Sequence, residues 1–202
     1  PIHATRPRTH PQVLIIARVT VGHVGSMAAQ YQAAGVPFLR SMNIRPFEIQ
    51  LDGLVFIDQE FHARLKKSRL SPGDLAIVRT GYPGTAAVIP DTVTDANCSD
   101  LVIVRPSPGV SADYLCLFFN SPRGKRAVAG NLVGAAQKHF NVKAAKEALI
   151  PIPSQDEQRR LSAQCQAVRI GTQDVRRTLD QRCAELDLLR STVLLAAFSG
   201  SL

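Results

Sequence analysis

Cysteine and histidine are scarce, and their spacing is unlike that of a metal site. The 202-residue chain has five histidines and four cysteines, namely Cys98, Cys116, Cys165 and Cys183. No two of these cysteines form a C-x-x-C pair, so the sequence argues against a zinc site. Widely spaced cysteines without a secretory leader are typical of reduced thiols, and we expect a cytoplasmic protein.

Long apolar runs are also missing. No segment approaches the roughly 20 consecutive apolar residues of a membrane-spanning helix, and no charged-then-apolar leader is present. We therefore expect no membrane partner.

The motifs of several enzyme classes are absent. There is no Asn/Asp-Pro-Pro-Tyr motif of an amino-methyltransferase, no F-x-G-x-G cofactor loop and no phosphate loop. Asp91 and Asp95 lie close in sequence, but no neighbouring Glu-x-Lys completes a nuclease metal site. These absences favour a binding protein without catalytic residues, a metal or a cofactor of its own. A self-contained nuclease or methylase is the weaker alternative.

Positive charge is what the chain has in excess. It carries 24 Lys and Arg against 16 Asp and Glu, a formal net charge of +8 and a pI of about 9.8. This excess favours a polyanionic partner, most often nucleic acid, although an ordinary basic protein remains the alternative. With 45% hydrophobic residues, the chain can bury a core in one domain with an extension or in two small domains.

The segment 69–90 organises the globular part of the chain. Two apolar runs, 75–78 and 85–89, flank a Gly/Pro turn, which predicts a β-hairpin or a strand–loop–strand unit. Arg79, Thr80, Gly81 and Tyr82 fall at the strand end and on the loop. Such positions commonly carry binding residues, because the strands hold them while the loop faces the ligand.

Further strands and helices are predicted around this unit. Apolar, β-branched runs predict strands at 13–24, 35–40, 54–57 and 101–104. Asp58 and Ser111 are expected to cap helices, the first of which continues to about Ser68. Ser121 and Pro122 are expected to restart a basic helix. Segment 91–99 is expected to be a polar loop. The elements together predict a mixed α/β (α+β) fold.

Polar side chains suited to nucleic acid lie in three other places. Arg40, Ser41 and Asn43 follow a predicted strand, and Gln137, Lys138 and His139 follow a glycine-rich stretch. Asn and Gln can pair with adenine through two hydrogen bonds, and Lys and Arg suit guanine or phosphate. His23, in a Gly-x-x-Gly turn, is a lesser candidate, because such a histidine is more often a solvated turn residue.

The last 49 residues predict one long helix. The proline-containing segment 149–153 favours an extended linker, and Ser154 to Glu157 form a capping box. We therefore expect a globular domain at 1–153 and a helix within 154–202. A heptad seam repeats along the helix, interrupted by Thr172 and Arg182, and such a helix needs a partner helix. The seam residues are Leu161, Val168, Val175, Leu179, Leu186, Leu189 and Val193.

Five motifs in order resemble those of a known family. They are GVPFLRSMNI, FHARLKKSRLSPGDLAIVRTGYPGTAAVIP, GAAQKHFNV, LIPIPSQDEQRRL and LLAAFSGSL. From about Val19 to the end, the chain resembles a target-recognition domain and conserved spacer helix of the specificity subunit of type I restriction–modification systems. The P-x-P-x-x-x-E-Q-x-x-L boundary is the most diagnostic of these motifs.

The resemblance implies a fold, a function and partners. It implies a recognition domain with a mostly antiparallel, curved sheet and flanking helices, which reads one half of a split DNA target. Two long helices pair antiparallel and set the spacing between the two halves. Methyltransferase subunits dock on this scaffold and bring S-adenosylmethionine, and a restriction subunit joins the same complex.

The chain holds one recognition domain and one helix, which corresponds to half of such a subunit. A fragment and a half-length form that dimerises are both consistent with this. The residues carried over as DNA-facing are Arg40, Ser41, Asn43, Arg79, Thr80, Gly81, Tyr82, Gln137, Lys138 and His139, with His23 as a lesser candidate. The alternative from another class is a coiled-coil assembly or adaptor protein without sequence-specific DNA binding.

Overall fold

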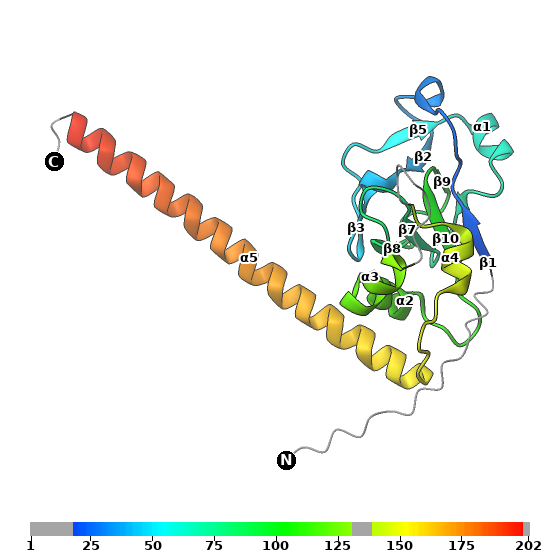
Figure 1. Cartoon of the computed structure of the whole chain (residues 1–202). Helices are drawn as coiled ribbons and strands as arrows, with labels where there is room; N and C mark the ends of the chain where they lie inside the picture. The colour runs from blue at the N-terminus through cyan, green and yellow to red at the C-terminus, as the bar shows by residue number, and fades with distance from the viewer. Residues whose placement is uncertain (1–17, 131–138, 200–202) are drawn as a thin grey trace, which may run out of the picture. The chain divides into compact units, whose positions relative to one another are not determined.

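The computed structural model describes residues 18–130 and 139–199, and the chain divides into two units, 1–159 and 160–202. The first unit is built on two four-stranded sheets (Figure 1). The first sheet has the order β1 (Arg18–Val21), β10 (Leu101–Arg105), β7 (Leu75–Val78) and β8 (Ala86–Val88). All its pairs are antiparallel, and the predicted hairpin is confirmed, with Ala76 opposite Ala87.

The second sheet has the order β5 (Val55–Ile57), β2 (Val36–Leu39), β9 (Ala96–Cys98) and β6 (Arg69–Leu70). Its β2–β9 pair is parallel and its other pairs are antiparallel. A two-stranded ribbon of β3 (Ile44–Arg45) and β4 (Glu48–Ile49) completes the strands. The prediction that 91–99 is a loop throughout is wrong, because its last part forms β9, which is buried between two neighbours.

Short helices connect and cover these sheets. They are η1 (Ala28–Gln30), η2 (Ser41–Asn43), α1 (Gln59–Arg64), α2 (Ala112–Asn120), α3 (Pro122–Ala129) and α4 (Val142–Glu147). Both predicted caps are confirmed: the side chains of Asp58 and Ser111 each accept a hydrogen bond from a backbone N–H in the first turn. The predicted helix restart after Ser121 is also found, and the Ser121 side chain caps it in the same way. The first helix is shorter than predicted, because Leu65 leaves the helical conformation and 69–70 joins the second sheet.

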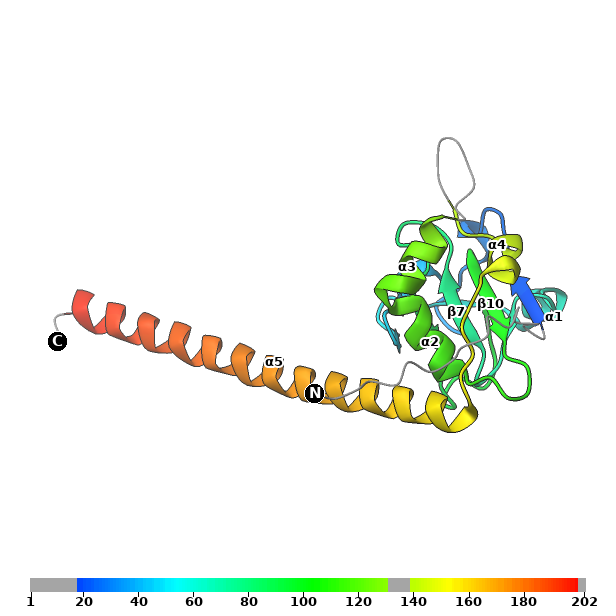
Figure 2. The ribbon, with the colours of Figure 1, turned by 60° about the horizontal axis from the view of Figure 1, so that its bottom comes forward.

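Helix α2 lies against the first sheet, and α3 follows it after a sharp corner (Figure 2). At this corner a side chain on Gly124 would meet the carbonyl oxygen of Phe118 at 2.0 Å, so only glycine allows the approach. Phe119 packs edge-to-face on Phe140, with ring centroids 6.1 Å apart, and both rings are fully buried. The aromatic residues of α2 are therefore core residues, as their apolar surroundings predict.

Helix α5 (Gln155–Phe198) begins in the first unit and forms the described part of the second. Its first turn is held by Gln158, which is 1% exposed. Oε1 of Gln158 accepts from the backbone N–H of Ser111, and Nε2 donates to the carbonyls of Gly109 and Pro153. The first unit therefore includes the start of the helix. Among the described residues, no helix has both the length and the apolar character that crossing a bilayer requires.

Candidate nucleic-acid interface

Asp100 joins three of the predicted binding segments. It sits between β9 and β10 with φ +52°, a left-handed conformation that Asp tolerates better than most residues. Its backbone N–H donates to the carbonyl of His23 (3.2 Å), and its carbonyl accepts from Oγ of Ser41 (3.3 Å). Its carboxylate accepts from Nη1 of Arg79 (3.3 Å). We call His23, Ser41, Arg79 and Asp100 the Asp100 cluster.

Arg79 connects this cluster to the segment 139–141. Its Nε donates to the carbonyl of Phe140 (3.3 Å), and its own carbonyl accepts from the N–H of Phe140 (3.0 Å). His139, which is half-buried, is thereby held beside the end of β7. The Arg79 side chain is only 14% exposed, so its role includes bracing these segments. Gln137 and Lys138 lie outside the described residues.

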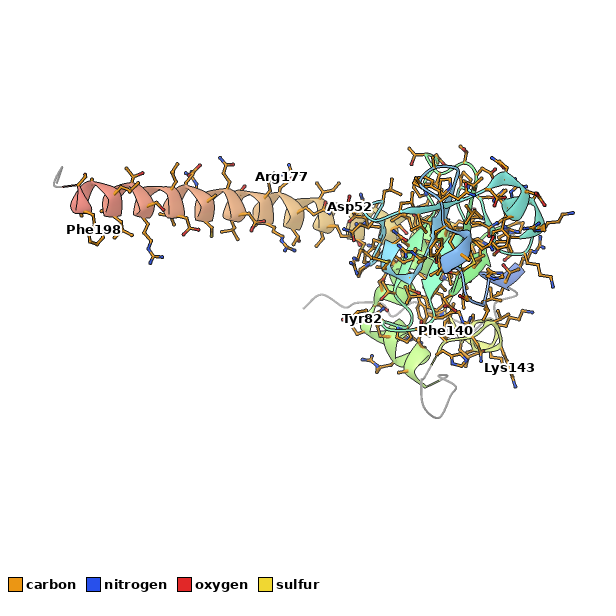
Figure 3. The ribbon with its side chains drawn as sticks, turned by 90° about the horizontal axis from the view of Figure 1, so that it is seen from above. Asp52, Tyr82, Phe140, Lys143, Arg177 and Phe198 are labelled. Atoms are coloured by element: carbon orange, nitrogen blue, oxygen red, sulfur yellow. The ribbon has the colours of Figure 1, made fainter. Side chains whose placement is uncertain are left out.

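The hairpin loop between β7 and β8 presents Tyr82. The Tyr82 ring is 80% exposed, and Gly81 before it has φ +79°, which favours glycine. Thr80 is half-buried, and its carbonyl accepts from the N–H of Tyr82 (3.0 Å). Figure 3 labels Tyr82 together with Phe140 on this unit. A rigid aromatic ring exposed on a loop can stack on a base or contact a base edge.

The base of the same loop is fixed by α2 and α3. Asn120 of α2 both donates to the carbonyl of Ala86 (2.8 Å) and accepts from its N–H (3.2 Å). A side chain on Gly84 would meet Val128 of α3 at 2.8 Å, so the loop packs closely on α3. Nζ of Lys125 donates to Oγ1 of Thr85 (3.1 Å), and partial burial lowers the pKa of Lys125. The loop is thus held in place before any ligand binds.

Asn43 is a correction to the predicted site. Its side chain is fully buried; it accepts from the N–H of Arg40 (3.0 Å) and donates to the carbonyl of Gln50 (3.0 Å). An amide used in this way supports the loop and offers nothing to a base edge. Arg40 is half-buried and also braces this region, since Nη2 donates to the carbonyl of Gly53 (2.8 Å) and its guanidinium lies 5.5 Å from the Tyr31 ring.

His23 is held mainly by packing. Its backbone bridges to Ser99, and its ring meets Phe61 of α1 edge-on, with centroids 5.9 Å apart. The ring is half-buried, consistent with a support for the turn that carries Val24, which is 61% exposed.

A buried polar network in the second sheet was not predicted from the sequence. Asn97 of β9 is fully buried, and its Oδ1 accepts from the N–H of Cys98 (3.1 Å) and from Oγ of Ser68 (2.5 Å). Its Nδ2 therefore faces Nδ1 of His62 (3.3 Å), which must act as the acceptor. The ring proton is then on Nε2, which lies 3.1 Å from Oδ1 of Asp95.

This network is structural in character. Hydrogen bonds from the Arg69 guanidinium lower the pKa of Asp95. The described residues contain no group of three or more metal-ligating side chains. Burial also raises the pKa of the Cys98 thiol, which keeps it protonated and unreactive.

The apolar seam on α5 is uncovered within a single chain. Val168 is 69% exposed, Leu186 is 65% exposed and Leu189 is 59% exposed. Three further seam residues, Val175, Leu179 and Val193, are also exposed. Leu161, near the start of the helix, is half-buried. Burying each such side chain contributes about 1.5–3 kcal/mol, so this surface favours association.

Comparison with known proteins gives one consistent result, although no family model matches the chain. A curated relative, the type I restriction enzyme EcoBI specificity subunit of Escherichia coli, is 22% identical over 175 residues, which cover 83% of the chain and 36% of the relative. The sequence thus resembles part of a type I specificity subunit, as the five motifs predict.

Two solved structures share the fold. One is a chain from a study of assembly and conformational transition of the type I R-M system (TM-score 0.68, 17% identity, 89% of this chain and 43% of that chain). The other is the HsdS subunit from Thermoanaerobacter tengcongensis (TM-score 0.58, 17% identity, 85% and 46%). The predicted mixed α/β fold with a long C-terminal helix is confirmed. The chain spans about a third of the length of the curated relative and less than half of either structure.

Proposed function

We propose that the chain is a DNA sequence-recognition subunit of a type I restriction–modification complex and reads one half of a split target. In this role it performs no chemistry. Residues 1–153 hold the recognition domain, and residues 154–202 hold the spacer helix. The net charge of +8 supports a polyanionic partner, and the similarity to the EcoBI specificity subunit supports DNA as that partner.

The convergence of separate segments at Asp100 is the observation that carries the proposal. Side chains or backbone groups of His23, Ser41 and Arg79 contact Asp100. Arg79 is also hydrogen-bonded to Phe140, the residue after His139. Tyr82 projects from the adjoining loop. We assign direct DNA contact to Arg79, Thr80, Gly81, Tyr82, His139, Gln137 and Lys138, with Arg79 also bracing these segments, and a positioning role to Arg40, Ser41 and His23.

The proposed partners follow from the same role. Double-stranded DNA contacts the first unit, and methyltransferase subunits carrying S-adenosylmethionine dock on the chain; a restriction subunit can join them. Helix α5 pairs with an equivalent helix, either in a second copy or in a second half of a longer subunit. A second copy would place two identical readers on a target with two-fold symmetry.

Duplex binding by the full chain tests the proposal. Fluorescence anisotropy with a pool of duplexes, with and without a type I methyltransferase subunit, is expected to show binding that weakens steeply as salt rises. Adding the methyltransferase subunit should strengthen binding to a subset of sequences. Equal affinity for all duplexes in the presence of that subunit would contradict a recognition role.

A further inference from the structure

We propose that α5 pairs with α5 of a second copy in one antiparallel register, the register that sets Thr172 of each helix against Arg182 of the other. This inference rests on the proposed function for the existence of a helix pair and on the resemblance for its antiparallel direction; it adds the choice of a second copy as partner and the register. The described helix runs from Gln155 to Phe198, about 66 Å, which leaves room for several possible registers.

The exposed seam favours association with another helix. Its exposed members recur with heptad spacing along one stripe of α5, which is the pattern of a two-helix contact. The stripe is narrow, since charged residues such as Arg176 and Glu185 occupy the positions beside it. Arg177, which Figure 3 labels on α5, lies off the stripe and pairs with Asp174 within the helix. A second copy offers the same narrow stripe and is therefore self-complementary.

The charge distribution along α5 favours the antiparallel direction. From Gln155 to Arg177 the helix has five arginines and three acidic residues, whereas from Thr178 to Phe198 it has two arginines and three acidic residues. Antiparallel pairing places the basic half of each helix beside the acidic half of the other. Parallel pairing would place basic beside basic and would also stack Arg182 on Arg182 in the seam.

The two polar seam residues select the register. With Thr172 opposite Arg182, every other layer between Leu161 and Val193 is apolar on both sides. These layers are Leu161 with Val193, Cys165 with Leu189, Val168 with Leu186, and Val175 with Leu179, each formed twice about the two-fold axis. No charged seam residue then faces an apolar one.

Neighbouring registers lose this match. A shift of one heptad in one direction sets Thr172 against Leu189 and Arg182 against Leu179. A shift in the other direction sets Thr172 against Val175 and Arg182 against Cys165. Either shift places two guanidinium groups per pair against apolar layers, where burial of a charge without a hydrogen-bonding partner is costly.

The hydrogen bonding of Thr172 is suited to this partner. Its hydroxyl donates to the carbonyl of Val168 (2.8 Å), which leaves the oxygen free to accept. Arg182 has donors only, and its Nη1 already donates to Oε2 of Glu185 in its own helix (2.9 Å). The remaining guanidinium N–H groups can therefore reach the Thr172 oxygen of the second copy.

Thiol cross-linking tests the register with the native Cys165. In a Cys183→Ala background, Cys98 and Cys116 are buried, so Cys165 is the remaining accessible thiol among the cysteines. Leu189→Cys in this background should give a covalent dimer with a short thiol-specific cross-linker. Ala196→Cys, the matched variant roughly 10 Å further along the helix, should not.

Each result has a distinct meaning. Cross-linking of Ala196→Cys in place of Leu189→Cys would overturn the register, and cross-linking of the background through Cys165 alone would overturn the antiparallel direction. A monomer by light scattering in every variant would overturn the helix pair. Sequence-dependent duplex binding by the same samples would then still stand, which separates this inference from DNA recognition.

Charge substitution gives a second test that needs no cross-link. Thr172→Asp should leave the dimer at least as tight, because the new carboxylate faces Arg182. Adding Arg182→Asp should weaken dimerisation at least about tenfold, because carboxylates then face each other. The matched control adds Arg177→Asp, which lies off the seam, and should cause no such loss. Equal weakening by both additions would contradict the proposed register.

Discussion

The carboxylate of Asp100 lies 3.3 Å from Nη1 of Arg79 and joins the turn after β9 to the end of β7. Asp100 is 52% exposed at its side chain, whereas Arg79 is 14% exposed. The pair therefore holds a cation at the rim of the candidate interface and partly neutralises it. A phosphate group could compete with Asp100 for this guanidinium, so we expect substitution of Asp100 to change the affinity for DNA.

Asp100→Asn is expected to raise general duplex affinity. Asparagine keeps a hydrogen-bond acceptor and tolerates the positive φ, but it removes the negative charge beside Arg79. The slope of log affinity against log salt should steepen by up to about one, since one more cation becomes available to phosphate. Salt titrations of duplex binding measure this. An unchanged slope would show that Arg79 does not face DNA.

Tyr82→Ala should impair recognition without unfolding the chain. The ring is 80% exposed, so stability should change by less than about 0.5 kcal/mol. Loss of a stacked or edge contact should cost about 1–3 kcal/mol of binding to the preferred duplex. Tyr82→Phe is the matched control and should keep most of the affinity if stacking dominates. Full affinity in Tyr82→Ala would remove the loop from the interface.

Asn43→Ala should act on stability. Removing the buried amide leaves the N–H of Arg40 and the carbonyl of Gln50 without this partner, at a cost of about 1–3 kcal/mol. Urea denaturation should show this loss, while the folded fraction should bind DNA as the unaltered chain does. A selective loss of sequence preference in folded Asn43→Ala would restore this residue to the contact surface.

Local features of the fold could be predicted from the sequence, and features assembled from distant segments could not. The hairpin of β7 and β8 and the caps at Asp58 and Ser111 follow from short patterns, and all are confirmed. Strand β9 was missed because Ala96–Cys98 has no β-branched residue, and its pairing partners lie far away in sequence. Tertiary burial decides such a strand.

The candidate site shows the same division. The residue types at Arg79 and Tyr82 are evident from the sequence, but their meeting with Ser41 and His23 through Asp100 depends on the fold. The identity of Asp100 gave a weak signal, since Asp is among the few residues that tolerate a left-handed turn. Asn43 was misread because an amide suited to a base edge is equally suited to closing a loop.

The stability of the first unit should depend on pH through the carboxylate of Asp95. Hydrogen bonds from Arg69 lower its pKa in the folded state, so its stabilising contribution is present above the ordinary carboxyl pKa. This contribution is lost as pH falls through the lowered value. Asp95→Asn should therefore be less stable than the unaltered chain near neutral pH, with the difference shrinking below about pH 4.

The effect should be small, because both side chains of the pair are about half exposed. Thermal unfolding as a function of pH measures it, and Glu60→Gln, which removes an exposed pair of α1, is the matched control. A difference that is constant across the acid range would show that the carboxylate charge of Asp95 contributes nothing.

Selection from a random duplex pool tests the central claim most directly. The full chain, assembled with a type I methyltransferase subunit, is retained with its bound duplexes, which are then sequenced. DNA recognition by the first unit predicts enrichment of one defined sequence, lost in Tyr82→Ala and kept in a Lys67→Ala control, which removes an exposed cation after α1. No enrichment, or the same enrichment in Tyr82→Ala, would contradict the account of this surface.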